Sequence, residues 1–188
     1  MNIIKALAFL LAGGSTLLGF ELHEHVNSPR WKVKTLADSM ALPAEVMPSS
    51  IEEQCALPAP KVDESVARLP SERQVFAVTA NLIAAKREFD GDYHLVLEDP
   101  VTHLHIIAEI PDTTGKAPRS YRDQFAEARL AVDRICGAPG LLGIKIRQPV
   151  RIEVTGIGFF DEAHLITPNG MPSNFREIHP VIHIRVLS

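Results

Sequence analysis

The sequence predicts a mostly β domain with a single helix over residues 71–188. Apolar and polar residues alternate in five short segments, the period-2 pattern of half-buried strands. A longer segment between the third and fourth of them has a broad apolar face at helical spacing. Glycine and proline clusters separate the segments and favour turns. These three observations indicate a small globular domain built around one sheet.

The individual elements follow from the same patterns. Strands are expected at residues 75–85, 93–97, 104–110, 150–156 and 178–187. Pro111 ends the third strand, because proline cannot donate a hydrogen bond to a strand ladder. A helix is expected next, with Ser120 as its N-cap and Gly137 as its C-cap, and Pro139 prevents its continuation.

The order of three strands, one helix and two strands predicts a five-stranded OB-like barrel with the helix between strands three and four. Closing the sheet into a barrel protects the edges of such short strands. Gly156 and Gly158 fit the bends that a small barrel needs. An α+β sandwich has the same element order and remains the alternative.

Composition and charge limit the partners. The net charge of −4 and the isoelectric point near 6.1 give no bulk attraction to nucleic acid or to an anionic membrane. We therefore expect a protein or small-molecule ligand in the cell envelope rather than a nucleic acid. The sequence indicates no transmembrane partner.

Residues 1–20 resemble an export signal. Lys5 precedes a short apolar run that is too brief for a membrane span and has the length of a secretory h-region. The segment is expected to be a cleaved signal peptide, or an N-terminal anchor, of a periplasmic or secreted protein. Residues 21–70 are rich in proline and are expected to form a linker or an arm laid over the domain.

The chain has two cysteines, Cys55 and Cys136. In an exported protein an even number permits a disulfide. Cys55 lies in the proline-rich segment and Cys136 ends the expected helix, so two unpaired thiols are the alternative. The sequence leaves the choice open.

Acidic residues and histidines gather around the second and third strands. Asp92 begins one strand, and Glu109 and Asp112 end the next, so a hairpin could bring the three carboxylates together. Hard cations such as Ca²⁺ prefer such oxygen ligands. The alternative is that these acids only form turns. His94 projects from the face opposite Tyr93 and would meet His179 only if the fold joins their strands.

Other chemistries find no support. The sequence has no G-x-S-x-G nucleophile motif, no P-loop and no dinucleotide-binding glycine pattern. His103 and His105 form an H-x-H pair, which is half of a zinc site, and are interpreted as solvated strand residues.

Four motifs resemble a family of small, exported, functionally uncharacterised bacterial proteins over residues 73–188. They are DGDYHLVLED at 90–99, AEIPD at 108–112, VTGIGFFD at 154–161 and HPV at 179–181. The resemblance implies export and a compact β-rich domain. His164 and His179 are candidate binding residues. This chain has Thr113 and Thr114 where relatives carry a cysteine, and it lacks the H-G-Q that follows F-F-D in relatives.

A second, looser resemblance is to staphylococcal-nuclease-like OB domains. It depends on Asp90-Gly91-Asp92 and on Glu109-Ile110-Pro111-Asp112. The resemblance implies that Asp92, Glu109 and Asp112 would hold a divalent cation, Ca²⁺ in preference to Zn²⁺. His94 is the candidate base for such a reaction. No arginine matches the family's catalytic ones, so charge developing on a phosphate would lack donors.

Three functions are therefore expected in order of preference. The first is an exported OB-like binding domain of unknown ligand without enzymatic activity and without an assured cofactor. The second is a divalent-metal-dependent nuclease or phosphodiesterase. The third is an envelope protein-interaction module anchored by the proline-rich arm.

Overall fold

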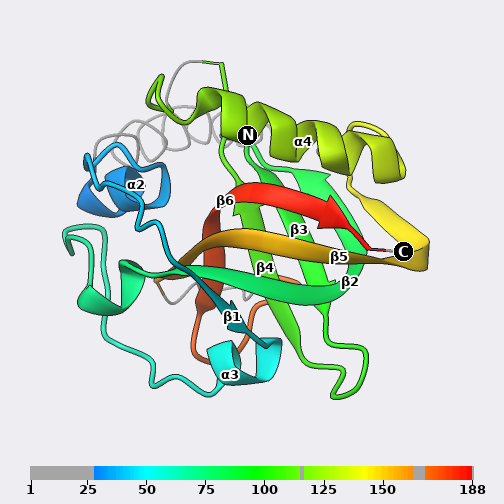
Figure 1. Cartoon of the computed structure of the whole chain (residues 1–188), viewed down its shortest axis with the longest axis horizontal. Helices are drawn as coiled ribbons and strands as arrows, with labels where there is room; N and C mark the ends of the chain where they lie inside the picture. Colours follow the sequence, from blue (N-terminus) through cyan, green and yellow to red (C-terminus); the bar gives the residue numbers. More distant parts are fainter. Residues whose placement is uncertain (1–27, 115–116, 163–167, 188) are drawn as a thin grey trace, which may run out of the picture.

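The structure is a computed structural model that describes residues 28–114, 117–162 and 168–187 (Figure 1). These residues form a mostly β fold, as predicted, but they contain three α-helices where the sequence predicted a single helix. The expected signal or anchor at residues 1–20 lies outside the described residues. No helix in the described ranges has both the length and the apolar character that a membrane crossing requires.

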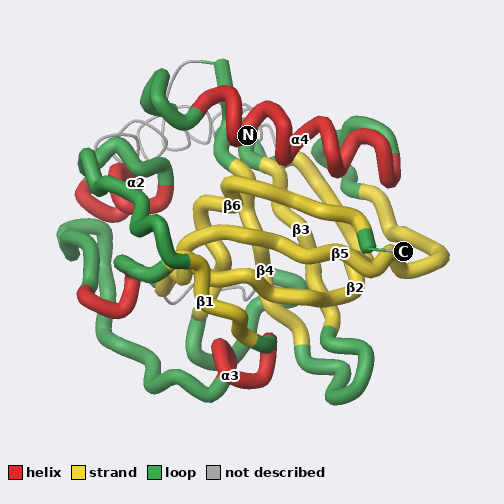
Figure 2. The backbone as a smooth tube through the Cα atoms, in the orientation of Figure 1, coloured by secondary structure: helices red, strands yellow, loops and turns green. Residues whose placement is uncertain are grey.

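One sheet contains six strands and bends into a ring (Figure 2). Its strands are β1 (Val46–Ser49), β2 (Val75–Arg87), β3 (Tyr93–Glu98), β4 (His105–Ile110), β5 (Ile144–Phe160) and β6 (Arg176–Val186). Their spatial order is β1-β2-β3-β4-β6-β5. The ring closes because β2 also pairs antiparallel with β5 along most of its length.

The strand count and the helix position differ from the prediction. The structure has six strands instead of five, and the long helix follows the fourth strand in the chain instead of the third. The extra strand is β1, in the proline-rich arm, whose Val46 pairs in parallel with Val75. β3 pairs with β2 only from Asn81 onward, so the start of β2 has a free side that β1 fills. β1 is too short to show an alternating pattern.

Helix α4 (Arg122–Cys136) packs over one end of the ring (Figure 1). Its buried residues are Phe125, Ala128 and Val132, which share one face at helical spacing. The predicted N-cap Ser120 is wrong, because Tyr121 occupies that position and makes no side-chain cap bond. Gly137 is the C-cap as predicted, with a φ of 78° that glycine tolerates best.

Both faces of the sheet are buried along β3, most of β4, the end of β5 and the start of β6. Its interior is filled by aliphatic side chains, among them Val78, Leu82, Leu95, Leu97, Ile106, Ala108, Ile152, Val154 and Val181. The intervening residues of β3, β4 and β6 point the other way. These include His94, Glu109, Glu177 and His179.

The arm covers that outer face. Helix α2 (Pro29–Lys34) places Arg30 against Glu72, with two charge-assisted hydrogen bonds of 2.9 and 2.7 Å between buried side chains. The Arg30 guanidinium also lies 4.1 Å from the ring centre of Phe159. Helix α3 (Ile51–Cys55) supplies Gln54, whose Oε1 accepts from the buried Arg176 at 2.9 Å. These contacts dock residues 28–74 on the ring, and the predicted domain boundary at Ser71 stays a prediction.

The two cysteines are free thiols. Cys55 Sγ lies 3.6 Å from the carbonyl oxygen of His105, and Cys136 Sγ lies 3.5 Å from that of Val132. Of the two alternatives, the structure has the unpaired one.

Candidate functional site

The candidate site lies on the outer face of three neighbouring strands. His94 on β3 stands directly opposite Glu109 on β4. β4 pairs in parallel with β6, with Ala108 opposite Ile178, so His179 comes next to Glu109. Because side chains two apart share a face, Asp92 joins His94 on that face. Residues from distant parts of the chain therefore meet under the arm.

Glu109 links the two histidines. Its Oε1 lies 2.8 Å from Nδ1 of His94, and its Oε2 lies 3.2 Å from Nδ1 of His179. Burial works against the ionised carboxylate, but the hydrogen bond from His94 and the charge of His179 hold the pKa of Glu109 below its ordinary value. Glu109 is therefore an anion shared by two imidazoles.

His94 is buried and has contacts on both ring nitrogens. Nδ1 also lies 3.5 Å from the Glu88 carboxylate, and Nε2 lies 3.4 Å from the carbonyl oxygen of Asn169. Burial disfavours its charged form, but the hydrogen bond to Glu109 outweighs it and raises the pKa of His94. A base needs a neutral imidazole, so this environment opposes the predicted role of His94.

His179 is fully buried and faces three carboxylates. Nδ1 lies 3.4 Å from Glu177 in addition to Glu109. Nε2 lies 3.7 Å from Oδ2 of Asp92, which is beyond hydrogen-bond distance, and has no hydrogen-bond partner among the described residues. Burial lowers the pKa of His179, but Asp92, Glu177 and Glu109 raise it to about 9. Nε2 of His179 thus points toward the Asp92 carboxylate without a hydrogen-bond partner among the described residues.

Asp92 and Asp112 have different roles. Oδ1 of Asp92 accepts a hydrogen bond of 2.8 Å from the backbone N–H of Asp112. The Asp112 carboxylate itself turns to Thr114, accepting from its backbone N–H at 3.1 Å and from its hydroxyl. The structure therefore brings Asp92 and Glu109 together with His179, while the Asp112 side chain stays in a local turn.

The cluster also contains Lys34 and Glu177, which sequence reasoning missed. Nζ of Lys34 lies 3.9 Å from Asp90. Burial opposes the charge of Lys34, but Glu109 and Asp92 raise its pKa above the ordinary value. Burial, helped by Glu109, raises the pKa of Glu177 to about 7. Lys34 lies in the arm, where no motif suggested a site. Glu177 could have been found from its position two residues before His179.

Two overlapping sets of side chains could hold a metal ion. One contains Asp92, Glu109 and His179, and the other contains Glu88, His94 and Glu109. Within each set one ligand atom per residue lies within 4.8 Å of the others. His164 lies outside the described residues. His103 is an exposed turn residue, and His105 sits at the start of β4, 3.2 Å from Glu98.

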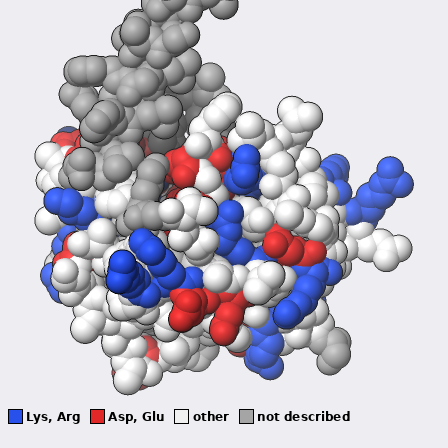
Figure 3. Space-filling model, turned by 90° about the horizontal axis from the view of Figure 1, so that it is seen from above, with Lys and Arg blue, Asp and Glu red and all other residues white. Residues whose placement is uncertain are grey.

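Charges elsewhere are mixed. On the face seen in Figure 3 acidic and basic side chains lie next to one another. That face has no continuous basic surface of the kind that follows a nucleic-acid backbone. The visible charge pattern therefore gives nucleic-acid binding no support there.

Comparisons with known proteins show no family. No family model matches the chain, and no curated protein matches it either. Among solved structures it is similar to an OBody bound to hen egg-white lysozyme, with 15% identity and a TM-score of 0.34 over 61% of this chain and 82% of the other.

Two tRNA synthetases are also similar in part. A putative aspartyl-tRNA synthetase from Leishmania major Friedlin has 11% identity and a TM-score of 0.38 over 77% of this chain. An asparaginyl-tRNA synthetase from Entamoeba histolytica has 8% identity and a TM-score of 0.36 over 69% of this chain. The chain spans only 21% and 23% of their lengths. Likenesses at these TM-scores support no conclusion about function.

Proposed function

We propose that this domain binds a divalent transition-metal ion through Asp92, Glu109 and His179. The observation that carries the proposal is the Nε2 atom of His179. It is buried, has no hydrogen-bond partner among the described residues and lies 3.7 Å from a carboxylate oxygen of Asp92. A buried polar atom without a partner costs about 1–3 kcal/mol. A metal ion at this position would remove that cost.

The donor atoms favour Zn²⁺ or a similar ion over Ca²⁺. Ca²⁺ takes roughly 6–8 oxygen ligands, whereas imidazole nitrogen with two carboxylates suits zinc and its neighbours. The Ca²⁺ expectation depended on Asp112, whose carboxylate is engaged by Thr114. Three protein ligands leave a coordination position for water or a ligand, and an ion held this way acts as a Lewis acid.

The residues around the site support this assignment. Metal-ligating histidines commonly donate their other ring N–H to a carboxylate, which fixes the ring. Glu109 and Glu177 lie 3.2 and 3.4 Å from Nδ1 of His179, so Glu177 can accept that hydrogen bond if Glu109 turns to the ion. When no metal is bound, the positive charges of Lys34 and of protonated His179 neutralise the carboxylates of Asp92 and Glu109. A divalent ion would take over this charge and release the proton.

Calorimetric titration tests the proposal directly. Protein freed of metal by chelation is titrated with Zn²⁺, Mn²⁺ and Ca²⁺, and one tight site for Zn²⁺ or Mn²⁺ is expected. His179→Gln should weaken that site by more than about tenfold. His183→Gln is the matched control, since His183 lies exposed on the same strand. Absence of any binding, or equal binding by both variants, would overturn the proposal.

We infer a binding role for this centre in preference to hydrolysis. The Arg30 side chain lies near the site but is engaged by Glu72 and by the carbonyl oxygen of Phe160, so it does not face a substrate. Hydrolysis of bis-p-nitrophenyl phosphate and of single- and double-stranded DNA by the Zn²⁺- and Mn²⁺-loaded protein tests this inference. Turnover that disappears in His179→Gln would assign the protein to metal-dependent phosphodiesterases instead.

We also propose that the ring is an OB-like barrel of an exported protein. Without β1, the order of the strands around the ring is β2-β3-β4-β6-β5. The ring closes where β5 pairs with β2. Helix α4 lies in the chain between β4 and β5, the third and fourth of these five strands.

Export is tested by expressing the protein in a bacterium and determining its mature N-terminus by mass spectrometry. Recovery of the protein from the cytoplasm with residue 1 still present would contradict export.

A further inference from the structure

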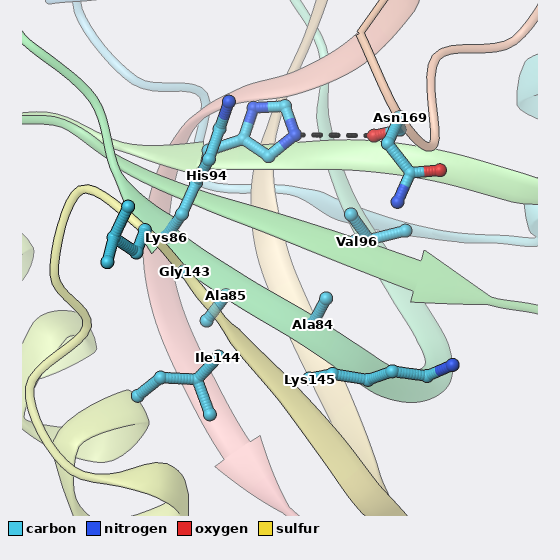
Figure 4. A pocket seen from close by; sticks show the side chains of 10 residues that line it. Ala84, Ala85, Lys86, His94, Val96, Gly143, Ile144, Lys145 and Asn169 are labelled. Atoms are coloured by element: carbon cyan, nitrogen blue, oxygen red, sulfur yellow. Dashed lines mark hydrogen bonds between the residues drawn. The ribbon is translucent and has the colours of Figure 1, made fainter.

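We propose that a hollow beside His94 binds a small organic carboxylate with an aliphatic body. The hollow has a volume of about 390 Å³, within the range of roughly 300–1,000 Å³ that small-molecule sites occupy. Its floor is apolar, and a few polar groups stand around it (Figure 4). None of the three proposed metal ligands lines this hollow, but His94 does, and its Nδ1 lies 2.8 Å from the proposed ligand Glu109.

Small residues create the hollow. Ala84 and Ala85 follow each other where a bulge after Leu82 shifts the register of β2. The Ala84 methyl group shares the outer face with Val96 and leaves room that a larger side chain would fill, whereas Ala85 faces the ring interior opposite Leu95. Gly143, with a φ of 73°, brings the start of β5 close to Lys86. The floor is completed by Val96 and Ile144. An aliphatic chain on this floor would be removed from water.

A glycine also places the opposite wall. Gly170 has a φ of 92°, and an added Cβ would lie 2.7 Å from a methyl group of Val96. A side chain there would push the loop away, so glycine lets Asn169 stand over the floor. In Figure 4 His94 and Asn169 lie together on one side of the hollow, across from Ile144 and Lys145.

The charged side chains around the hollow favour an anionic ligand. Lys86 is already paired with Glu88 at 2.8 Å. Lys145 is exposed and has no ion pair within the described ranges. It stands at the rim of the hollow, where a carboxylate could form a charge-assisted hydrogen bond with it. Among the described residues, none of those that line the hollow is acidic.

The rim is apolar as well. Leu142 lines the hollow and is fully exposed, with a relative accessibility of 102%. An isolated exposed leucine is ordinary. Here it extends the apolar floor toward solvent next to the free lysine. The combination of an aliphatic surface and one cation matches an amphipathic monoanion, such as a medium-chain fatty acid.

Calorimetric titration with octanoate tests the proposal in the presence of a chelator, so that metal binding has no influence. Octan-1-ol, acetate and octylammonium are the comparison probes. Octanoate is expected to bind once per chain and more tightly than all three. Lys145→Met should weaken octanoate about tenfold, the usual effect of losing one charge-assisted contact. Ala84→Leu should abolish binding by filling the floor.

The matched controls are Lys61→Met and Ala59→Leu, which change exposed residues of the arm outside the hollow and should bind octanoate like the unaltered protein. Circular dichroism checks that each variant folds. If Ala84→Leu does not fold, Lys145→Met alone tests the site. Equal affinity for octan-1-ol and octanoate would overturn the anion assignment. The proposed site would be overturned if octanoate did not bind at millimolar concentration. Unchanged octanoate binding by both Lys145→Met and Ala84→Leu would also overturn it.

Discussion

Nδ1 of His179 lies 3.2 Å from Oε2 of Glu109, although the two residues are far apart in the sequence. The contact exists because β4 and β6 are parallel neighbours in the ring. Glu109 uses its other oxygen to bind His94. This carboxylate is therefore the centre of the buried polar cluster, and changing it should alter both metal binding and stability.

Replacing Glu109 by glutamine removes the charge shared by the two histidines. The proposed metal site should lose more than about tenfold in affinity. The free energy of unfolding should fall by about 3–5 kcal/mol, since removing one partner leaves buried charges uncompensated. Titration with Zn²⁺ and urea denaturation measure the two effects. Glu98→Gln is the control, because the ion pairs of Glu98 in the described part of the chain are with the more exposed His103 and His105. A stable Glu109→Gln protein with unchanged affinity would contradict the assignment.

Metal affinity should rise with pH up to about 9. The pKa of His179 is raised to about 9, so the imidazole is mostly protonated at neutral pH and the metal must displace a proton. Calorimetry at pH 7 in buffers of different ionisation enthalpy should show proton release on Zn²⁺ binding. Affinity that does not change between pH 7 and 9 would mean that His179 is not a ligand.

The metal-free protein should become less stable as the pH rises from about 4.5 to 9. The pKa of Glu177 is raised from 4.5 to about 7, so its contribution is full below 4.5 and is lost as the pH passes 7. The pKa of His179 is raised from 6.5 to about 9, so its contribution is full below 6.5 and is lost as the pH passes 9. Urea denaturation at several pH values measures the trend, and His179→Gln should flatten its upper part.

Gly158→Ala should destabilise the protein by about 1–3 kcal/mol or more. A Cβ at Gly158 would overlap the guanidinium of Arg176, which is buried and held by Gln54. Thermal denaturation measures the loss. Gly140→Ala is a matched control, since nothing lies within 4 Å of an added Cβ there. Equal melting temperatures for the two variants would show that Arg176 can move aside.

Glu72→Gln should loosen the arm. Glu72 is fully buried and accepts hydrogen bonds from Arg30 and from the backbone N–H groups of Leu69 and Phe160. Loss of its charge leaves the guanidinium of Arg30 buried without a counter-ion, which costs about 3–5 kcal/mol. Limited proteolysis should then cut within the arm faster than in the unaltered protein. Glu45→Gln, at an exposed arm position, should leave the cleavage rate unchanged.

The sequence by itself determined the local structure of the ring. Alternation placed a strand within each of β2 to β6, because a strand with one buried face has a period of two. It missed the bulge after Leu82, which turns Ala85 inward instead of Ala84, and it gave β5 as 150–156 instead of Ile144–Phe160. The apolar face and Gly137 located α4. The turn chemistry around Asp92 and Glu109 marked them as candidate site residues. All of these signals lie within a few residues of the position that they specify.

Only the tertiary structure decided which distant residues meet. β1 has no alternating pattern, and α2 has only the Ser28 cap and Pro29 as a local start signal. Both form where the ring offers a free strand side and a buried outer face. The parallel pairing of β4 with β6 put His179 beside Glu109, and the arm brought Lys34 to them. The Asp112 carboxylate accepts a hydrogen bond from Thr114 in its own turn and does not join the cluster. Such placements depend on strand order and docking, which spacing along one chain does not encode.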